Sequence, residues 1–253
     1  ASWDEALKFS SNGLLKLKKS NGSSGLAGFG SAKCSNEEAY LFQKLIRTGL
    51  KTNNVDHCTR LCHASSVAAL LETIGSGAVT APFYEVEHSE VIIVIGANPT
   101  ENHPVAATFF KNAAKNGSKL IVMDPRGQAL RKYATHMLQF KSGTDVALLN
   151  SIMHVIIEEN LFDQEYIKHH TSGFEQLKDH LKMFSPKKMS NNTGIDESEI
   201  RKVARLFANT KKGIIFWGMG ISQHIHGTDN ARCLISLALM TGNVGRRGTG
   251  LHP

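Results

Sequence analysis

The sequence predicts an α/β fold, Rossmann-like, built mainly from parallel strands with helices on both faces. Three short runs, Val91–Ile95, Lys119–Met123 and Gly213–Trp217, are almost wholly apolar, which is typical of central parallel strands that helices cover on each side. A helix-like segment between the first two runs opens at Pro104 and ends at Asn116-Gly117. The order strand, helix, strand indicates a parallel crossover unit, and the same alternation along the chain indicates the α/β class.

Other helices are predicted from the capping signals that precede them. Ser35 followed by Glu38 has the spacing of a capping box, in which each side chain bonds the other residue's backbone N–H. Thr144-Asp145 opens a long stretch with an apolar face. The predicted helices are 39–50, 146–159 and 200–208, and the last of these follows an acidic start at 196–199. Residues 20–25 and 185–194 are expected to be loops.

Composition excludes several classes of protein. The 29 basic and 22 acidic residues give a net charge of +7, which suits small acids and phosphate-bearing cofactors. The short basic runs 16–19 and 187–188 are not interleaved with aromatic residues, so no nucleic-acid partner is expected. No apolar run is long enough to cross a bilayer, and the first residues lack the pattern of a signal peptide. We therefore expect no membrane segment and a cytoplasmic location.

The four cysteines are too few for a disulfide framework in a chain of 253 residues. Any special cysteine should therefore be special for its reactivity or for metal binding. Cys34 and Cys233 have no activating neighbour in the sequence and are expected to be buried as small apolar residues. A redox role stays open for Cys58 because it is close to Cys62.

Several histidines are expected to have no catalytic role. His224 and His226 form a His-x-His pair that could bind a metal from one edge, but no third ligand lies nearby in the sequence. We expect them to be polar lining beside a cofactor loop. His169-His170 is expected in a solvent-exposed loop.

Glycines and polar residues follow each of the three predicted strands, where ligands bind in open parallel sheets. A glycine permits close backbone approach, an acid suits a ribose or an amino-purine edge, and an arginine suits a phosphate. Each loop alone fits an ordinary turn, but together they predict a large nucleotide-like ligand that spans several strands. The sequence lacks a Gly-x-Gly-x-x-Gly segment after an early strand, which disfavours a simple nicotinamide dehydrogenase. The residues are Gly96, Asn98 and Glu101 after the first strand, Asp124, Pro125 and Arg126 after the second, and Gly218, Met219, Gly220 and Gln223 after the third.

Cysteine and histidine residues cluster between positions 57 and 63. His57, Cys58, Cys62 and His63 could all bind a metal, but their spacing has no matching second half downstream, so a closed zinc site is not predicted. The thiolate of Cys62 could instead ligate a soft metal while the imidazole of His63 accepts a proton near neutral pH. From the residues alone, a buried cysteine beside an incidental histidine explains the pair equally well.

Blocks of sequence around these candidates occur in order along nearly the whole chain. The first block runs from Asn54 through Cys62-His63 to Ala78; the others are 95–99 with 103–104, 122–126, 143–150, 154–159, 217–221 and 239–245. In these blocks the chain resembles the catalytic subunits of molybdenum- or tungsten-dependent formate dehydrogenases, which belong to the molybdopterin oxidoreductase family. So many ordered blocks support the resemblance more strongly than any single motif does.

The resemblance implies a role for each candidate position. Cys62 matches the selenocysteine or cysteine that ligates the metal, and His63 matches the neighbouring histidine that assists proton movement. Glu101 stands where related enzymes can have aspartate. Positions that match the surroundings of the pterin-guanine dinucleotides are Asn98, Glu101, Asp124, Arg126, Gly143, Asp145, Met219 and Gln223, and Gly96, Pro125, Gly218 and Gly220 belong to the same loops.

The resemblance also implies the domain organisation and the reaction. Residues 1–60 would form the first part of the molybdopterin-binding core, 61–142 a Rossmann-like region with the active-site cysteine and one nucleotide-binding side, and 143–253 a second α/β region that returns to the core. The implied cofactor is bis-molybdopterin guanine dinucleotide with Mo or W, and the implied reaction is two-electron oxidation of formate to carbon dioxide, with electrons passed to partner subunits or domains. The family's N-terminal 4Fe-4S domain and its C-terminal segments, including the one with the substrate-binding arginine, fall outside the matched region. We therefore expect this chain alone to be an inactive fragment.

Two alternatives belong to the same fold. Some large respiratory-complex subunits have lost the metal and serve as scaffolds, although the presence of Cys62-His63 argues against that role. Nitrate reductase-like enzymes also use a cysteine ligand, but Cys62-His63 followed by Ser66-Val67-Ala68 favours formate. The sequence leaves the choice between Mo and W open.

Overall fold

The computed structural model describes residues 1–253, which divide into two compact units, Ala1–Cys62 and His63–Pro253. Each unit has its own parallel sheet and its own apolar core. The predicted regions 61–142 and 143–253 both contribute strands to the sheet of the second unit. No helix in the chain combines the length and the apolar character needed to span a membrane.

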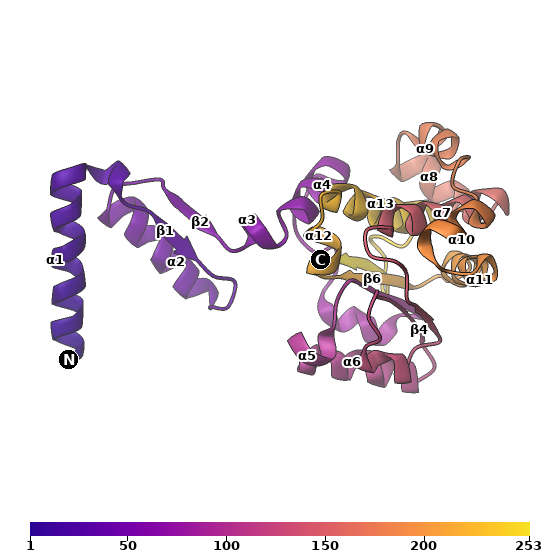
Figure 1. The fold of residues 1–253 in the computed structure, drawn as a ribbon, viewed down its shortest axis with the longest axis horizontal. Coiled ribbons are helices and arrows are strands. Elements are labelled where there is room, and N and C mark those ends of the chain that lie inside the picture. Colours follow the sequence, from indigo (N-terminus) through magenta and orange to yellow (C-terminus); the bar gives the residue numbers. More distant parts are fainter. The chain divides into compact units, whose positions relative to one another are not determined.

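The first unit contains a two-stranded parallel sheet (Figure 1). Its small core consists of Leu26, Ile46 and Leu50. The predicted capping box is confirmed, because Ser35 Oγ accepts from the Glu38 N–H and the Glu38 carboxylate accepts from the Ser35 N–H. The elements are α1 (Trp3–Asn21), a 3₁₀ turn η1 (Ser23–Gly25), β1 (Gly28–Gly30), α2 (Asn36–Lys44), a π-helical turn η2 (Leu45–Gly49), β2 (Val55–His57) and α3 (Thr59–Cys62).

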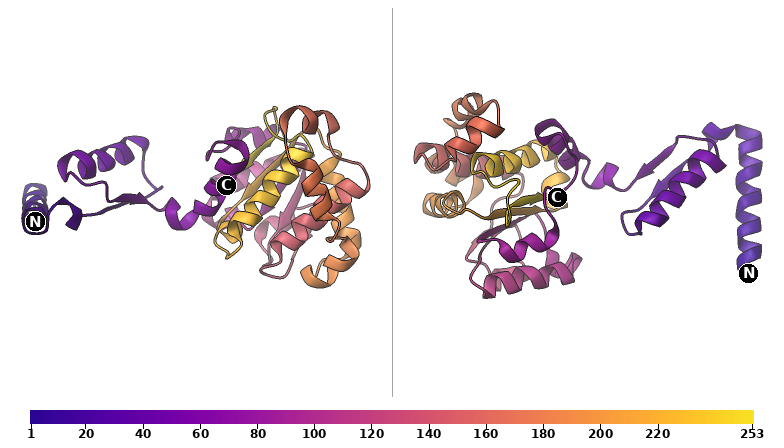
Figure 2. Two further views of the ribbon diagram at one scale, coloured as in Figure 1. Left: turned by 90° about the horizontal axis from the view of Figure 1, so that it is seen from above. Right: turned by 180° about the vertical axis from the view of Figure 1, so that it is seen from behind.

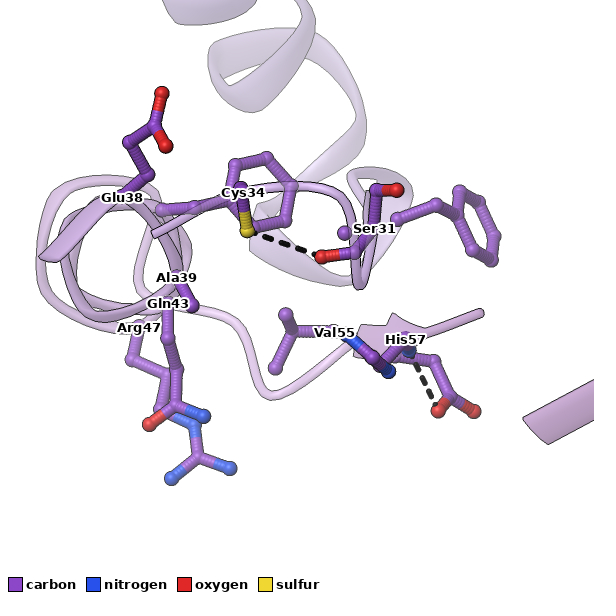
Figure 3. Close-up of a pocket in the computed structure, with 12 residues that line it drawn as sticks. Ser31, Cys34, Glu38, Ala39, Gln43, Arg47, Val55 and His57 are labelled. Atoms are coloured by element: carbon purple, nitrogen blue, oxygen red, sulfur yellow. Dashed lines mark hydrogen bonds between the residues drawn. The ribbon is translucent and has the colours of Figure 1, made fainter. Parts of the chain in front are cut away.

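A cavity of about 590 Å³ lies within the first unit, beside α2 and the short sheet (Figure 3). Phe42 and Val55 form part of its wall, and the Cys34 thiol donates to the Ser31 carbonyl oxygen at 3.0 Å. Cys34 is exposed, so the prediction that it is buried is wrong. The reason is that the loop after β1 lies outside the small core, which has no further layer of side chains to cover it.

The second unit is built on a parallel sheet with the strand order β5-β4-β3-β6-β7. The three predicted strands are confirmed with the predicted bounds as β3 (Val91–Ile95), β4 (Lys119–Met123) and β6 (Gly213–Trp217). Two short strands that the sequence pattern missed, β5 (His136–Leu138) and β7 (Gly250–His252), lie at the two edges. The α/β class with mainly parallel strands is therefore confirmed.

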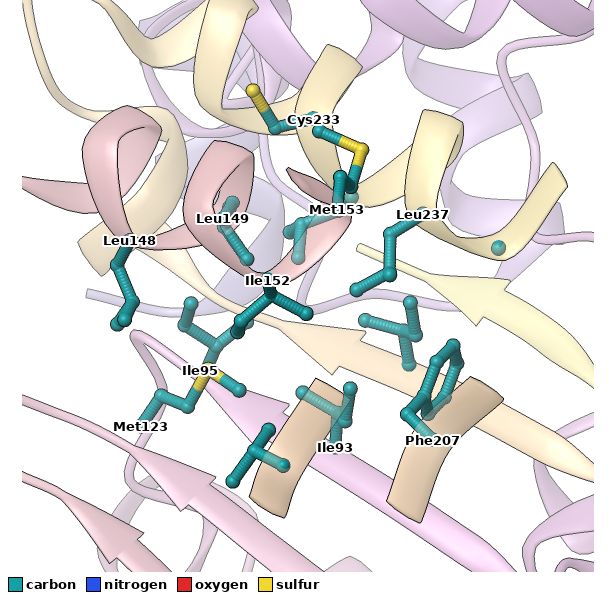
Figure 4. Close-up of a cluster of buried hydrophobic side chains, with 14 of the residues drawn as sticks. Ile93, Ile95, Met123, Leu148, Leu149, Ile152, Met153, Phe207, Cys233 and Leu237 are labelled. Atoms are coloured by element: carbon teal, nitrogen blue, oxygen red, sulfur yellow. The ribbon is translucent and has the colours of Figure 1, made fainter. Parts of the chain in front are cut away.

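Each central strand sends alternate side chains into two separate cores. Ile93 and Ile95 pack with helices α7 (Asp145–Glu158), α11 (Glu197–Ala208) and α13 (Gly227–Met240) in the larger core (Figure 4). Ile92 and Val94 face the other way and pack with α6 (Pro104–Lys115) in the smaller core. Figures 1 and 2 show these helices on opposite faces of the sheet, which explains why the strands are apolar throughout.

Several predictions of local structure need correction. Residues 186–193 form a helix where the sequence pattern predicted a loop, because Pro186 and Met189 are buried against the core side of the unit. His169-His170 ends helix α8 (Gln164–His170), although both side chains are exposed as predicted. Asp196 and Thr144 precede their helices as predicted, but neither side chain caps a helix N–H. The remaining elements are α4 (Ala64–Ile74), η3 (Phe83–His88), α5 (Pro99–Asn102), η4 (Ala129–Lys132), α8 (Gln164–His170), α9 (Phe174–Leu181), α10 (Pro186–Thr193) and α12 (Met219–Ser222).

Candidate active site

The site of interest lies where the strand order reverses. After β3 the chain adds β4 and β5 on one side of the sheet, and it later returns to place β6 and β7 on the other side. The loops that leave β3 and β6 therefore diverge at the carboxyl end of neighbouring strands. This switch point is the place where open parallel sheets bind their ligands.

Glycines bring the two diverging loops into direct backbone contact. Gly96 has a φ of +58°, and a Cβ there would lie 2.8 Å from the Ile221 backbone nitrogen. A Cβ on Gly220 would lie 2.7 Å, and one on Gly218 2.8 Å, from the Gly96 carbonyl oxygen. Gly96 therefore allows close approach of the neighbouring loop, and the predicted close approach of a ligand stays a prediction. The glycines keep the floor of the site free of side chains.

A cavity of about 370 Å³ opens above these loops. Ten of the twelve residues predicted to bind cofactor line it, namely Gly96, Asn98, Asp124, Pro125, Arg126, Gly143, Asp145, Gly218, Met219 and Gly220. The two exceptions are Glu101 and Gln223, which follow the same strands but are exposed outside the lining. Both stand in short helical turns, α5 for Glu101 and the end of α12 for Gln223.

Two buried carboxylates give the cavity its polarity. Asp124 is 6% exposed, and its carboxylate accepts from the Arg126 N–H at 2.8 Å. Asp145 is 3% exposed at the start of α7, and burial raises its pKa while backbone hydrogen bonds at Asp145 and Gly143 oppose the rise. Buried carboxylates can bind the N–H groups of a purine or a pterin.

Gln128 is a polar contact of this region that the sequence pattern did not single out. It is buried, and its amide nitrogen donates to the Ala97 carbonyl oxygen at 2.8 Å and to Asp124 Oδ2 at 3.4 Å. Its amide oxygen is buried without a protein partner. Gln128 thus ties the loop after β4 to the loop after β3.

The cavity lining includes other residues that the prediction omitted. Asn102 and His103 come from the loop after β3, so their position after the strand was the available signal. Phe140 and Ser142 follow β5, which is too short to be recognised as a strand from the sequence. His224 also lines the cavity, as the prediction of polar lining for this residue requires.

A second cavity, of about 430 Å³, lies next to the first and includes His63 in its wall. Ala97, His103, Gly218 and Met219 line both cavities, so the two share walls. The second cavity is mainly apolar, with phenylalanines at 83, 110 and 216. His63 is therefore placed on the apolar side of the switch point.

A chain of hydrogen bonds holds the His63 ring. Trp217 Nε1 donates to Ser66 Oγ at 2.8 Å, Ser66 Oγ lies 2.5 Å from Ser222 Oγ, and Ser222 Oγ lies 3.5 Å from His63 Nδ1. Ser65 Oγ also donates to the Ser222 carbonyl oxygen at 2.7 Å, which fixes α12 against α4. Burial lowers the pKa of His63, so its imidazole is neutral at neutral pH and can accept a proton.

Cys62 is the last residue of the first unit, directly before His63. It ends the one-turn helix α3 and is half-buried. Burial raises the pKa of its thiol first, and the neighbouring Cys58 raises it further. Cys62 is therefore a protonated thiol near neutral pH.

The donor groups at the switch point fit a pterin nucleotide. Buried carboxylates, side-chain amides and exposed backbone at the glycines suit the N–H groups and carbonyls of fused heterocycles, and the guanidinium of Arg126 suits a phosphate. Gln128 Oε1 adds a buried acceptor without a partner beside Asp124. Cys62 directly precedes His63 in the sequence, and its thiol is a ligand type that soft metals prefer.

The chain belongs to the molybdopterin oxidoreductase family, whose model matches residues 1–253. Membership of this family implies a molybdopterin cofactor. Over its whole length the chain is 42% identical to the F420-dependent formate dehydrogenase 1 subunit alpha of Methanococcus maripaludis and 39% identical to formate dehydrogenase H of Escherichia coli. It spans 37% and 35% of those two proteins. The solved structure of acetylene hydratase from Pelobacter acetylenicus superposes with a TM-score of 0.83 at 27% identity, over 99% of this chain and 34% of that one.

Proposed function

We propose that the whole protein is the catalytic subunit of a formate dehydrogenase, which oxidises formate to carbon dioxide with the loss of two electrons. The cofactor in this proposal is bis-molybdopterin guanine dinucleotide with Mo or W. The named relatives support the choice of formate, and the chain spans little more than a third of their length.

The observation that carries the proposal is the position of His63. Its ring lines a cavity that shares Ala97, His103, Gly218 and Met219 with the polar cavity at the switch point. A proton acceptor therefore stands beside the site whose donor set fits a pterin nucleotide. Cys62 precedes it directly and supplies the soft ligand.

In this proposal, the residues of the polar cavity hold and orient one nucleotide. The carboxylates of Asp124 and Asp145 accept N–H groups of the heterocycles, and Arg126 binds the phosphates. Asn98 is oriented by Thr100, whose hydroxyl donates to its amide oxygen at 2.6 Å. The glycines keep side chains away from the nucleotide's path.

The metal with its dithiolene sulfurs supplies the two-electron acceptor for formate when it is bound. Cys62 would hold the metal through its thiolate. Formate loses one proton equivalent together with the two electrons, and the neutral imidazole of His63 accepts that proton at Nε2. Uptake at Nε2 requires Nδ1 to keep its hydrogen, which Ser222 Oγ can accept. The apolar walls of the second cavity limit water around the imidazole.

Further parts of the proposal concern the whole protein. A 4Fe-4S cluster would carry the electrons away from the site, and electron-transfer subunits or domains would receive them. The cytoplasmic location expected from the sequence remains a prediction.

The test measures metal content and formate-dependent dye reduction by the whole protein, purified without oxygen. We expect Mo or W to be present and dye to be reduced. Replacing the ligand in a Cys62→Ala variant should lower formate oxidation by more than the ~10- to 100-fold that loss of an outer-shell partner causes. The control variant Cys34→Ala removes an exposed thiol and should retain activity.

Two outcomes would contradict the proposal. A metal-free protein with the pterin site empty would indicate a scaffold subunit. A metal-loaded protein that reduces nitrate and does not oxidise formate would indicate a nitrate reductase-like enzyme.

A further inference from the structure

Two cysteine side chains lie on one helical turn in the first unit. Cys58 stands between β2 and α3, and Cys62 ends α3. The backbone N–H of Cys62 donates to the Cys58 carbonyl oxygen at 3.1 Å, and so does the N–H of Leu61 at 3.1 Å. These bonds define a turn of α-helix, in which residues four apart lie on the same face.

A small backbone adjustment would bring the Cβ atoms of Cys58 and Cys62 close enough for a disulfide. Residues four apart on a helix have Cβ atoms ~5–6 Å apart. A disulfide needs a Cβ–Cβ distance of ~3.5–4.5 Å. Helix α3 has only four residues, none of them buried, so little packing opposes the closer approach. A helix this short also contributes little stability of its own.

The other two cysteines are poorer partners. Cys233 is buried in the second unit, and burial raises its pKa to about 12, so its thiol is unreactive. Cys34 is exposed, but it lies in the loop after β1 and not on the helical turn that carries Cys58 and Cys62. Cys58 is therefore the thiol closest in the chain to Cys62, and it is exposed to solvent.

We propose that Cys58 and Cys62 form a reversible disulfide when the chain meets a hydroperoxide. The exposed Cys58 attacks first: its sulfur bonds to one peroxide oxygen, the O–O bond breaks, and one water leaves. The product is a sulfenic acid on Cys58. The sulfur of Cys62 then attacks the Cys58 sulfur, the S–O bond breaks, and the second water leaves. In total two thiols lose two protons and two electrons, and hydrogen peroxide is reduced to two waters.

The consequence for the enzyme rests on the proposed function, in which Cys62 ligates the metal. A sulfur in a disulfide cannot act as a thiolate ligand, so the oxidised chain cannot receive the metal. The disulfide is reversible, whereas sulfinic and sulfonic acids are not restored by ordinary thiols. Cys58 therefore protects the ligand position before the metal is in place.

The protein's own trypsin sites permit a direct test. Cleavage after Lys51, Arg60 and Lys111 places Cys58 in peptide 52–60 and Cys62 in peptide 61–111. The 253-residue chain is treated at high dilution with hydrogen peroxide, alkylated and digested without reductant. We expect mass spectrometry to find 52–60 joined to 61–111, and dithiothreitol to separate them.

Two variants provide the matched controls. Cys34→Ser should retain the joined peptides, and Cys58→Ser should lose them. In Cys58→Ser we expect irreversibly oxidised Cys62 to increase several-fold, seen as the gain of two or three oxygens on peptide 61–111. The proposal is overturned if peptide 52–60 is instead joined to peptide 34–44, or if Cys58 and Cys62 are oxidised independently in the unmodified chain.

The test is independent of the proposed function. Disulfide formation needs no metal, so its absence would leave formate oxidation by the whole protein untouched. Conversely, a protein without metal could still form the disulfide, and only the assigned consequence would then fail.

Discussion

His252 provides a quantitative prediction about stability and pH. The residue lies on β7 with only 6% of its surface exposed, and its Nε2 is buried without a protein partner. Its ring stacks on Phe216 at a centroid distance of 4.5 Å. Burial lowers the pKa of His252 from 6.5 to about 4, because the charged ring would lose its hydration without gaining a counter-ion.

Stability falls as the pH is lowered because the unfolded chain binds a proton at His252 more readily than the folded chain does. Between the folded pKa of about 4 and the unfolded pKa of 6.5, the unfolded chain binds the proton and the folded chain does not. The stability contributed by the neutral ring is present above the unfolded pKa and is lost as the pH falls toward the folded pKa. Integration between about pH 7 and about pH 5 gives a loss of about 2 kcal/mol from this residue.

A His252→Phe variant should remove the loss of stability that His252 causes between the two pH values. Phenylalanine keeps the stacking on Phe216 and has no nitrogen to leave without a partner, so stability near neutral pH should be retained. The free energy of unfolding is measured in urea at both pH values from the fluorescence of the buried Trp217. A Trp3→Phe substitution in every variant removes the only tryptophan fluorescence of the first unit. We expect the variant to lose about 2 kcal/mol less than the parent between the two pH values.

The exposed His180 provides the control for the buried His252. His180→Phe replaces an exposed histidine in the same unit and should leave the pH dependence as in the parent. Equal losses of stability in the parent and in His252→Phe would show that burial does not keep the ring neutral, and the reasoning would be refuted.

Two other predictions concern the switch point. Gly220→Ala places a Cβ 2.7 Å from the Gly96 carbonyl oxygen, so we expect the free energy of unfolding measured in urea to fall by about 1–3 kcal/mol. The control Gly13→Ala lies on an exposed helix with nothing within 4 Å of the new Cβ, and it should raise the free energy of unfolding by about 1 kcal/mol. Ser222→Ala removes the hydroxyl beside His63 Nδ1 and should lower kcat of the whole protein about 10-fold with unchanged metal content; an unchanged kcat would mean that this hydroxyl does not position the ring.

Most of the sheet could be predicted because its strands are apolar on both faces. Val91–Ile95 begins after Glu90, ends before Gly96 and lies between two cores, so its apolar run predicts both its length and its central position. The edge strands β5 and β7 have three residues each and carry no such pattern. They exist because a longer strand already lies beside them to pair with.

The candidate site was predictable in part for the same reason. Parallel strands bring their carboxyl ends to one edge, so residues that directly follow strands line the cavity. Glu101 and Gln223 follow the strands too, but short helical turns carry them outside the lining. Cys34 was expected to be buried from its residue type alone, and the thin core of the first unit leaves it exposed.

The sequence by itself determined the α/β class, the central strands and the loops that line the switch-point cavity, and the role of the Cys62-His63 pair stays a prediction. These depend on local pattern and on the order of elements along the chain. Only the tertiary structure decided the strand order, the contact between the Gly96 and Gly220 loops, and the chain from Trp217 through Ser66 and Ser222 to His63. The loop contact and the hydrogen-bond chain join residues more than a hundred positions apart, and their free energy depends on which surfaces pack together.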